Sequence, residues 1–175
     1  MTLPPWARWA AIFGIPVLVL GAYAAWAAWP AVMGESVLLS TRPVDPPDML
    51  RGDYADLRLT IGSIEGANGY AEGERIYVVL APGATVEPGT GNAYWEVQSH
   101  HRSRPGLERD EVCLQGTVQH AGGGAVRVRY GIESYFIPKD ETLEDWRGKT
   151  VSVEAKVSGC EGRVTGIRLD GTPWP

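Results

Sequence analysis

Hydrophobic and polar residues are distributed unevenly along this chain. Residues 9–29 carry no charged side chain, whereas the later sequence mixes short apolar runs with charges and turn residues. As an α-helix, the apolar stretch would be about 32 Å long, which matches a bilayer core of ~30 Å. The pattern predicts a transmembrane helix over residues 9–30, preceded by a cytoplasmic N-terminus over residues 1–8.

The two ends of this apolar stretch carry tryptophans, among them Trp9 and Trp29, as at membrane interfaces. Arg8 precedes the stretch and Glu35 is the first charge after it, which favours an N-terminus inside and the rest of the chain outside the cytoplasm. A cleavable signal peptide is the alternative, since residues 22–24 have small residues at cleavage-like spacing. In both cases the remainder of the chain crosses the membrane.

Small residues along the apolar stretch would let another helix approach closely. They predict a helix contact surface, and the membrane lipid and other integral membrane subunits as partners. The residues of this surface are Gly14, Gly21, Ala24 and Ala28.

After residue 30 the pattern changes to short apolar runs separated by turn residues. Residues 31–52 contain several prolines and predict an extended connector. Strict alternation of apolar and polar side chains appears in residues 126–130 and 151–157, as expected of strands with one buried face. Further strand-length runs are residues 36–40, 54–64, 74–80, 93–101, 111–120, 125–137 and 163–169.

Glycine-rich turns lie inside residues 111–137 and 150–169, which predicts two β-hairpins. Residues 140–147 begin acidic and end basic, a polarity that suits a short helical turn. Residues 53–175 are therefore predicted to form an all-β extracytoplasmic domain, a small antiparallel barrel or sandwich.

Composition narrows the functional classes. The chain has 16 Lys and Arg against 21 Asp and Glu, and this acidity argues against nucleic acid as a partner. The sequence contains no phosphate-binding loop and no recognisable nucleophile-base order, so we assign no catalytic residue and no cofactor. His100 and His101 are adjacent and would point to opposite faces of a strand, so with His120 they do not predict a metal site.

Cys113 and Cys160 are the only cysteines, and both fall in the part predicted to lie outside the cytoplasm. An oxidising compartment would allow a disulfide between them. Two buried, unlinked thiols are the other interpretation, and the sequence leaves both open.

The segment from Pro43 to Leu57 includes the residues Arg51-Gly52-Asp53-Tyr54-Ala55-Asp56-Leu57. It resembles the signature of the bacterial GDYXXLXY protein family, whose Gly, Asp, Tyr and Leu fall on Gly52, Asp53, Tyr54 and Leu57. Residues 130–138, Tyr-Gly-Ile-Glu-Ser-Tyr-Phe-Ile-Pro, resemble a second segment of that family. Leu59 stands where the last Tyr of the signature would be, so an apolar packing role is retained there while the hydroxyl is absent.

The resemblance implies a membrane-anchored protein that occurs with multi-span membrane partners, and it implies no known activity. From the residues themselves, a Gly-Asp pair that opens a strand has an ordinary structural use in a turn. The alternative is that carboxylates of the two motif segments converge on a cation or ligand. The candidate binding residues are Asp45, Asp53, Tyr54, Asp56 and Glu133.

Three functions follow from this sequence, in descending order. The first is a non-enzymatic accessory or structural subunit of a membrane complex, anchored in the bacterial inner membrane with its domain in the periplasm. The second is a tethered module that binds a ligand or cation. The third is a membrane-tethered hydrolase, for which the sequence offers only scattered candidate groups.

Overall fold

The computed structural model describes residues 13–24, 34–42, 54–137, 146 and 148–174. The chain divides into two units, Met1–Gly34 and Glu35–Pro175. Each unit is considered by itself. The β-rich unit begins at Glu35, and not at residue 53 as predicted, because residues 35–40 form a strand of its main sheet.

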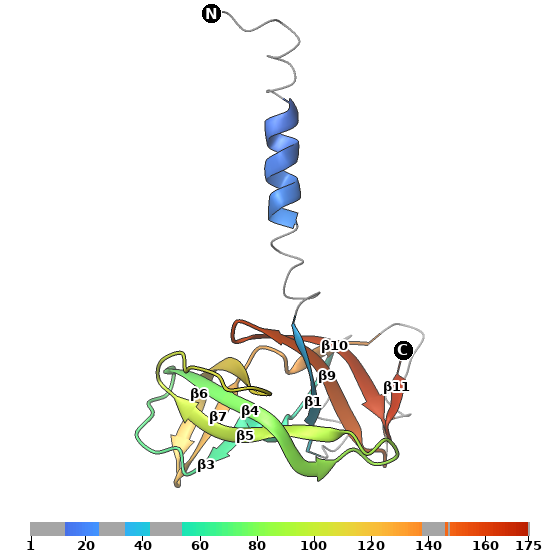
Figure 1. The fold of residues 1–175 in the computed structure, drawn as a ribbon. Coiled ribbons are helices and arrows are strands. Elements are labelled where there is room, and N and C mark those ends of the chain that lie inside the picture. The colour runs from blue at the N-terminus through green and yellow to red at the C-terminus, as the bar shows by residue number, and fades with distance from the viewer. Residues whose placement is uncertain (1–12, 25–33, 43–53, 138–145, 147, 175) are drawn as a thin grey trace, which may run out of the picture. The chain divides into compact units, whose positions relative to one another are not determined.

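In the first unit, residues 13–24 form an α-helix (Figure 1). Among the described residues, no helix is both long enough and apolar enough to cross a membrane. The predicted span over residues 9–30 extends past the described helix on both sides.

The second unit is mostly β and contains a four-stranded and a five-stranded antiparallel sheet. The four-stranded sheet has the order β1-β9-β10-β11. Its strands are β1 (Glu35–Ser40), β9 (Val151–Ser158), β10 (Glu161–Leu169) and β11 (Thr172–Trp174). The five-stranded sheet has the order β3-β7-β6-β4-β5. Its strands are β3 (Ser63–Glu65), β4 (Arg75–Val86), β5 (Ala93–His101), β6 (Val112–Gly122) and β7 (Ala125–Arg129).

A third, two-stranded sheet joins β2 (Tyr54–Asp56) to β8 (Ser134–Phe136). Between β2 and β3 the chain makes a short 3-10 helix, η2 (Thr60–Gly62). Together these elements pair two chain segments that are far apart in the sequence.

The sheets curve around one core to give a nearly closed five-strand antiparallel barrel (Figure 1). At the places where the two large sheets meet, β1 contacts β5, and β6 contacts β9 and β10. The alternating residues of β9 account for the inner face, since Val153 and its neighbours in phase are buried against Leu39 of β1. The all-β prediction is thus confirmed, and the barrel is the form it takes.

Both predicted hairpins are present, as β6–β7 and as β9–β10. Two long predicted strands are wrong as single strands. Residues 54–64 divide into β2, η2 and the start of β3, because β2 pairs with β8 while β3 pairs with β7. Residues 125–137 divide into β7 and β8, and Gly131, with a φ of 84°, lies at the break.

Two smaller predictions are described only in part. Residues 43–52 of the predicted connector lie outside the described residues, while residues 35–40 of the connector form β1. The predicted helical turn at residues 140–147 is described only at Trp146, which is buried in the core.

Candidate functional site

The two motif segments meet in the β2–β8 ribbon. Tyr54 of β2 lies opposite Phe136 of β8, and Asp56 lies opposite Ser134. The amide N–H of Leu57 then donates to the carbonyl oxygen of Glu133 at 2.6 Å, which extends the ribbon by one bond. The signature and the second motif segment therefore form one local structure, although more than 70 residues of sequence lie between them.

Glu133 holds the turn that leads into β8. Its two carboxylate oxygens accept from different backbone amides, Oε1 from the N–H of Tyr130 and Oε2 from the N–H of Gly131, the latter at 2.8 Å. Only 14% of the side chain is exposed, and Arg129 Nε lies 4.0 Å from Oε2. A carboxylate that accepts two amide hydrogens in this way stabilises a tight turn and has little capacity left for a ligand.

Tyr130 fastens the same turn to the β2–β3 connection. Its hydroxyl donates to the carbonyl oxygen of Ile61 in η2 at 2.8 Å. Burial raises the pKa of Tyr130, and the negative charge of Glu133 raises it further, so the phenol keeps its proton. Its hydroxyl therefore acts as a structural hydrogen-bond donor.

The apolar motif positions lie in the core. Leu57 is 1% exposed and Leu59 is 5% exposed. Leu59 also bridges to Thr41, just after β1. The expectation that Leu59 retains a packing role is confirmed.

The candidate ligand set is brought together only in part. Gly52, Asp45 and Asp53 lie outside the described residues, as does the side chain of Tyr54. Asp56 is exposed on β2, whereas the carboxylate of Glu133 is engaged with the turn. Within the described ranges, no group of three or more His, Cys, Asp or Glu side chains is placed to hold a metal ion.

The histidines are dispersed over several local contacts. His100 Nδ1 lies 3.0 Å from the hydroxyl of Tyr70, and His101 Nε2 lies 2.9 Å from the hydroxyl of Ser99. His120 pairs with Glu72 at 2.9 Å on the surface. These contacts hold loops and strand ends and do not converge on one point.

A buried ionic cluster joins the β4–β5 loop to the β10–β11 turn, and it was not predicted from the sequence. Glu87 is 1% exposed, and its Oε2 accepts from the hydroxyl of Thr90 at 2.6 Å and lies 3.2 Å from Arg168 Nε. Arg168 also donates to Glu154 Oε1 at 2.6 Å and to the carbonyl oxygen of Gly171. The hydrogen bond to Glu154 raises the pKa of Arg168.

The other carboxylate oxygen of Glu87, Oε1, is buried and accepts no hydrogen bond from the part of the chain that the structure describes. Gly171 shows how closely the two loops fit, because a Cβ there would lie 2.7 Å from the carbonyl oxygen of Pro88. The cluster contains no nucleophile, and its ion pairs connect two loops. We interpret it as a structural latch. The sequence carries no signal for it beyond an acidic residue in a turn.

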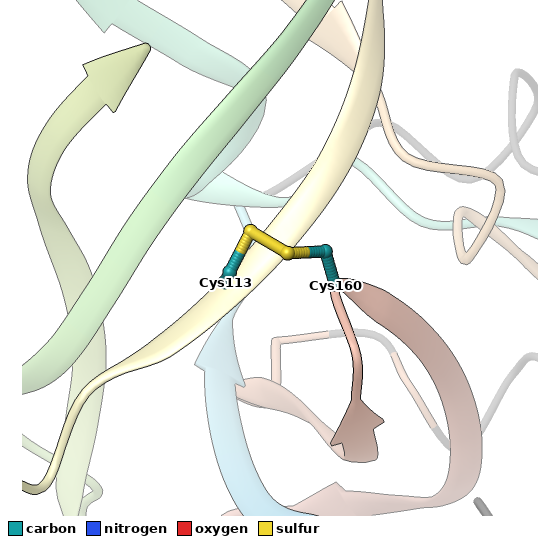
Figure 2. Close-up of a disulfide and its surroundings, with 2 residues drawn as sticks. All are labelled: Cys113 and Cys160. Carbon is teal, nitrogen blue, oxygen red and sulfur yellow. A yellow bond between two sulfur atoms is a disulfide. The ribbon is translucent and has the colours of Figure 1, made fainter. Parts of the chain in front are cut away.

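A disulfide links the two cysteines, so the structure has the bridged alternative. The sulfur atoms of Cys113 and Cys160 are 2.15 Å apart (Figure 2). Cys113 lies on β6 and Cys160 in the turn between β9 and β10, so the bond connects the two large sheets. The amide N–H of Gln115 donates to the carbonyl oxygen of Cys160 at 2.8 Å beside it.

Comparison with known proteins gives one match. A family model described as GDYXXLXY protein matches residues 16–164, which is most of the chain. No curated protein and no solved structure matches the chain significantly.

Proposed function

We propose a function from one premise: the chain belongs to the GDYXXLXY protein family. Its role is that of a non-enzymatic accessory subunit of a larger membrane protein complex. The N-terminal apolar segment anchors it in the bacterial inner membrane, with the N-terminus inside and the β-rich unit in the periplasm. The observation that carries this proposal is the surface of the helix at residues 13–24.

This helix exposes large apolar side chains around its circumference. Ile15, Val17, Leu18, Val19 and Leu20 are between 58% and 72% exposed. Such a surface is unfavourable in water, and it is accommodated by lipid or by other apolar helices. The tryptophans and the lack of charge on either side of the helix support the same environment.

One side of the helix is suited to a close helix contact. Gly14 and Gly21 are seven residues apart, so they lie on the same face, with Val17 and Ala24 beside them. Small residues let two backbones approach, which stabilises helix association in lipid. Val19 is five residues after Gly14 and lies on the opposite face, where lipid contact is expected.

The β-rich unit offers more support for a structural role than for ligand binding. The carboxylate of Glu133 and the hydroxyl of Tyr130, which are the most distinctive polar groups of the described motif, bond to backbone atoms of the same ribbon. The disulfide suits a compartment outside the cytoplasm. A family signature used in this way favours a rigid module that presents its surface to a partner.

Site-specific photocrosslinking in intact membranes tests this proposal. A photoreactive residue at Val17 should give a discrete higher-mass adduct with an integral membrane protein, and the matched position Val19 should give little. Gly21→Leu should reduce recovery of that partner from mild detergent, whereas Val19→Leu should not. A chain that migrates alone at monomer size and forms no adduct from either position would refute the role as a subunit.

A further inference from the structure

The disulfide closes a seam of the barrel that has no strand pairing of its own. Residues of β6 contact β9 and β10, yet β6 belongs to the five-stranded sheet and β9 and β10 to the four-stranded sheet. Across this seam, Gly162 packs so closely that a Cβ there would lie 2.7 Å from Leu114 Cδ2. The disulfide, the Gln115 amide bond and this contact hold the tip of the β9–β10 hairpin against β6.

Both sulfur-bearing residues are buried once the seam is closed. Cys113 is 1% exposed and Cys160 is 4% exposed. A disulfide forms by attack of a thiolate on a sulfur of another disulfide, and the two reacting molecules need direct access to each other. The finished fold does not provide this access to a second protein, so the bond must form before the seam closes.

The two cysteines differ in how accessible they are before closure. Cys160 lies in the two-residue turn of the β9–β10 hairpin, between the paired residues Ser158 and Glu161. This hairpin is formed by neighbouring residues and projects its turn at one end. Cys113 lies on β6 opposite Val79, in a strand with a neighbour on both sides, so assembly of that sheet covers it from the flanks.

The backbone at Cys160 indicates that its sulfur, and not its fit to the turn, explains its presence there. Gly159 and Cys160 have φ values of 61° and 73°, which are the two positive values that a type I′ hairpin turn needs. Glycine and asparagine favour such positions, while other side chains rarely adopt them. Cysteine is therefore a poor choice for this turn unless its thiol is used.

We propose that Cys160 is the residue that first reacts with a protein disulfide donor, and that Cys113 completes the bond as the barrel seam closes. The donor is a dithiol oxidase with a Cys-X-X-Cys disulfide. The Cys160 thiolate attacks one sulfur of the donor disulfide, which forms a mixed disulfide and releases a donor thiolate. The Cys113 thiolate then attacks the sulfur of Cys160, which releases the second donor thiolate.

The reaction balances without another reagent. The two thiols of this chain lose two electrons and two protons, and the donor disulfide gains both to become a dithiol. The assignment rests on the extracytoplasmic location of the proposed function, because such donors operate in oxidising compartments. It adds a transient partner that is distinct from the membrane complex.

Trapping of the mixed disulfide tests the order of attack. The full chain is produced in bacterial cells as Cys113→Ser and as Cys160→Ser, quenched with acid, alkylated, and examined on non-reducing gels and by mass spectrometry. Cys113→Ser should accumulate a reductant-sensitive adduct with a Cys-X-X-Cys protein through Cys160, at least about tenfold more than Cys160→Ser accumulates through Cys113. Equal adducts, more adduct through Cys113, or no adduct from either variant would overturn the proposal.

A second measurement on the unaltered chain guards against misfolding of the variants. Reduced full-length protein is diluted from urea into refolding buffer with oxidised glutathione, and single adducts are quantified at short times. The adduct at Cys160 should exceed that at Cys113 by about tenfold, and an equal ratio contradicts the proposed order. Trapping that persists when the Val17 crosslink is absent would refute only the subunit function. Cysteines that remain reduced in cells would refute the location and this assignment together.

Discussion

Replacement of Glu133 by glutamine is the most direct test of the interpretation that the family motif builds the fold. Glu133 accepts from the amides of Tyr130 and Gly131 with its two oxygens. A glutamine has the same shape but only one oxygen, so its NH2 group would face the second amide N–H. One charge-assisted bond is lost and one donor is left facing another donor.

The expected magnitude follows from these contacts. A hydrogen bond to a charged group contributes about 1.5–3 kcal/mol, and an unsatisfied buried donor costs about 1–3 kcal/mol. Because 14% of the Glu133 side chain is exposed, water can relieve part of that second cost. We therefore expect Glu133→Gln to lower the free energy of unfolding by about 2–3 kcal/mol. With a urea m-value near 2 kcal/mol/M, the midpoint should fall by about 1–1.5 M.

The assay is urea unfolding of the full chain in mild detergent, followed by tryptophan fluorescence and far-UV circular dichroism. Glu72→Gln is the matched control, because Glu72 pairs only with His120 and both side chains are largely exposed. Such a surface pair contributes about 0–1 kcal/mol. If Glu133→Gln shifts the midpoint no more than this control does, the carboxylate is not holding the turn, and a role in ligand binding becomes the better interpretation.

Three further predictions concern stability. Cys113→Ala/Cys160→Ala should lose about 4 kcal/mol, from the chain entropy of a cross-link between residues separated by 47 positions; urea curves with and without reductant measure this, and coincident curves would contradict it. The folded state raises the pKa of Tyr130, so its contribution is present below the unfolded value near pH 10 and is lost as the pH rises above it. Tyr130→Phe should therefore flatten the fall in stability above about pH 10, and an unchanged pH profile would argue against this source. Arg168→Leu leaves Glu87 buried without its counter-charge and should cost about 3 kcal/mol, part of which Glu87→Gln in the same chain should restore; thermal unfolding that finds the double variant less stable than the single one would contradict the latch.

The strands with one wet face were predictable from the sequence. In β7 and β9 every second residue is apolar, and the structure buries that phase of each strand. Their turns carry glycine, so the hairpins β6–β7 and β9–β10 also follow from neighbouring residues. In these cases the local pattern contains the whole instruction, because strand period and turn conformation depend on a few adjacent residues.

The pairing of β2 with β8 could not be read in this way. Both strands have three residues, and each was predicted as part of a longer strand. Their partner is chosen by contacts made after the chain has folded, including the Leu57 amide bond to Glu133. Short strands carry too little periodicity to show where they end, so only the tertiary structure divides residues 54–64 and 125–137.

The sequence by itself determined an apolar N-terminal segment, a mostly β unit after it, and membership of a family recognisable from Gly52 to Leu57. Tertiary structure decided what the polar residues do. Glu133 and Glu87 look alike as acidic residues in turns, yet one accepts from backbone amides and the other is buried against Arg168. The physical reason is that the state of a carboxylate depends on which distant donors surround it, and those donors come from other elements of the fold.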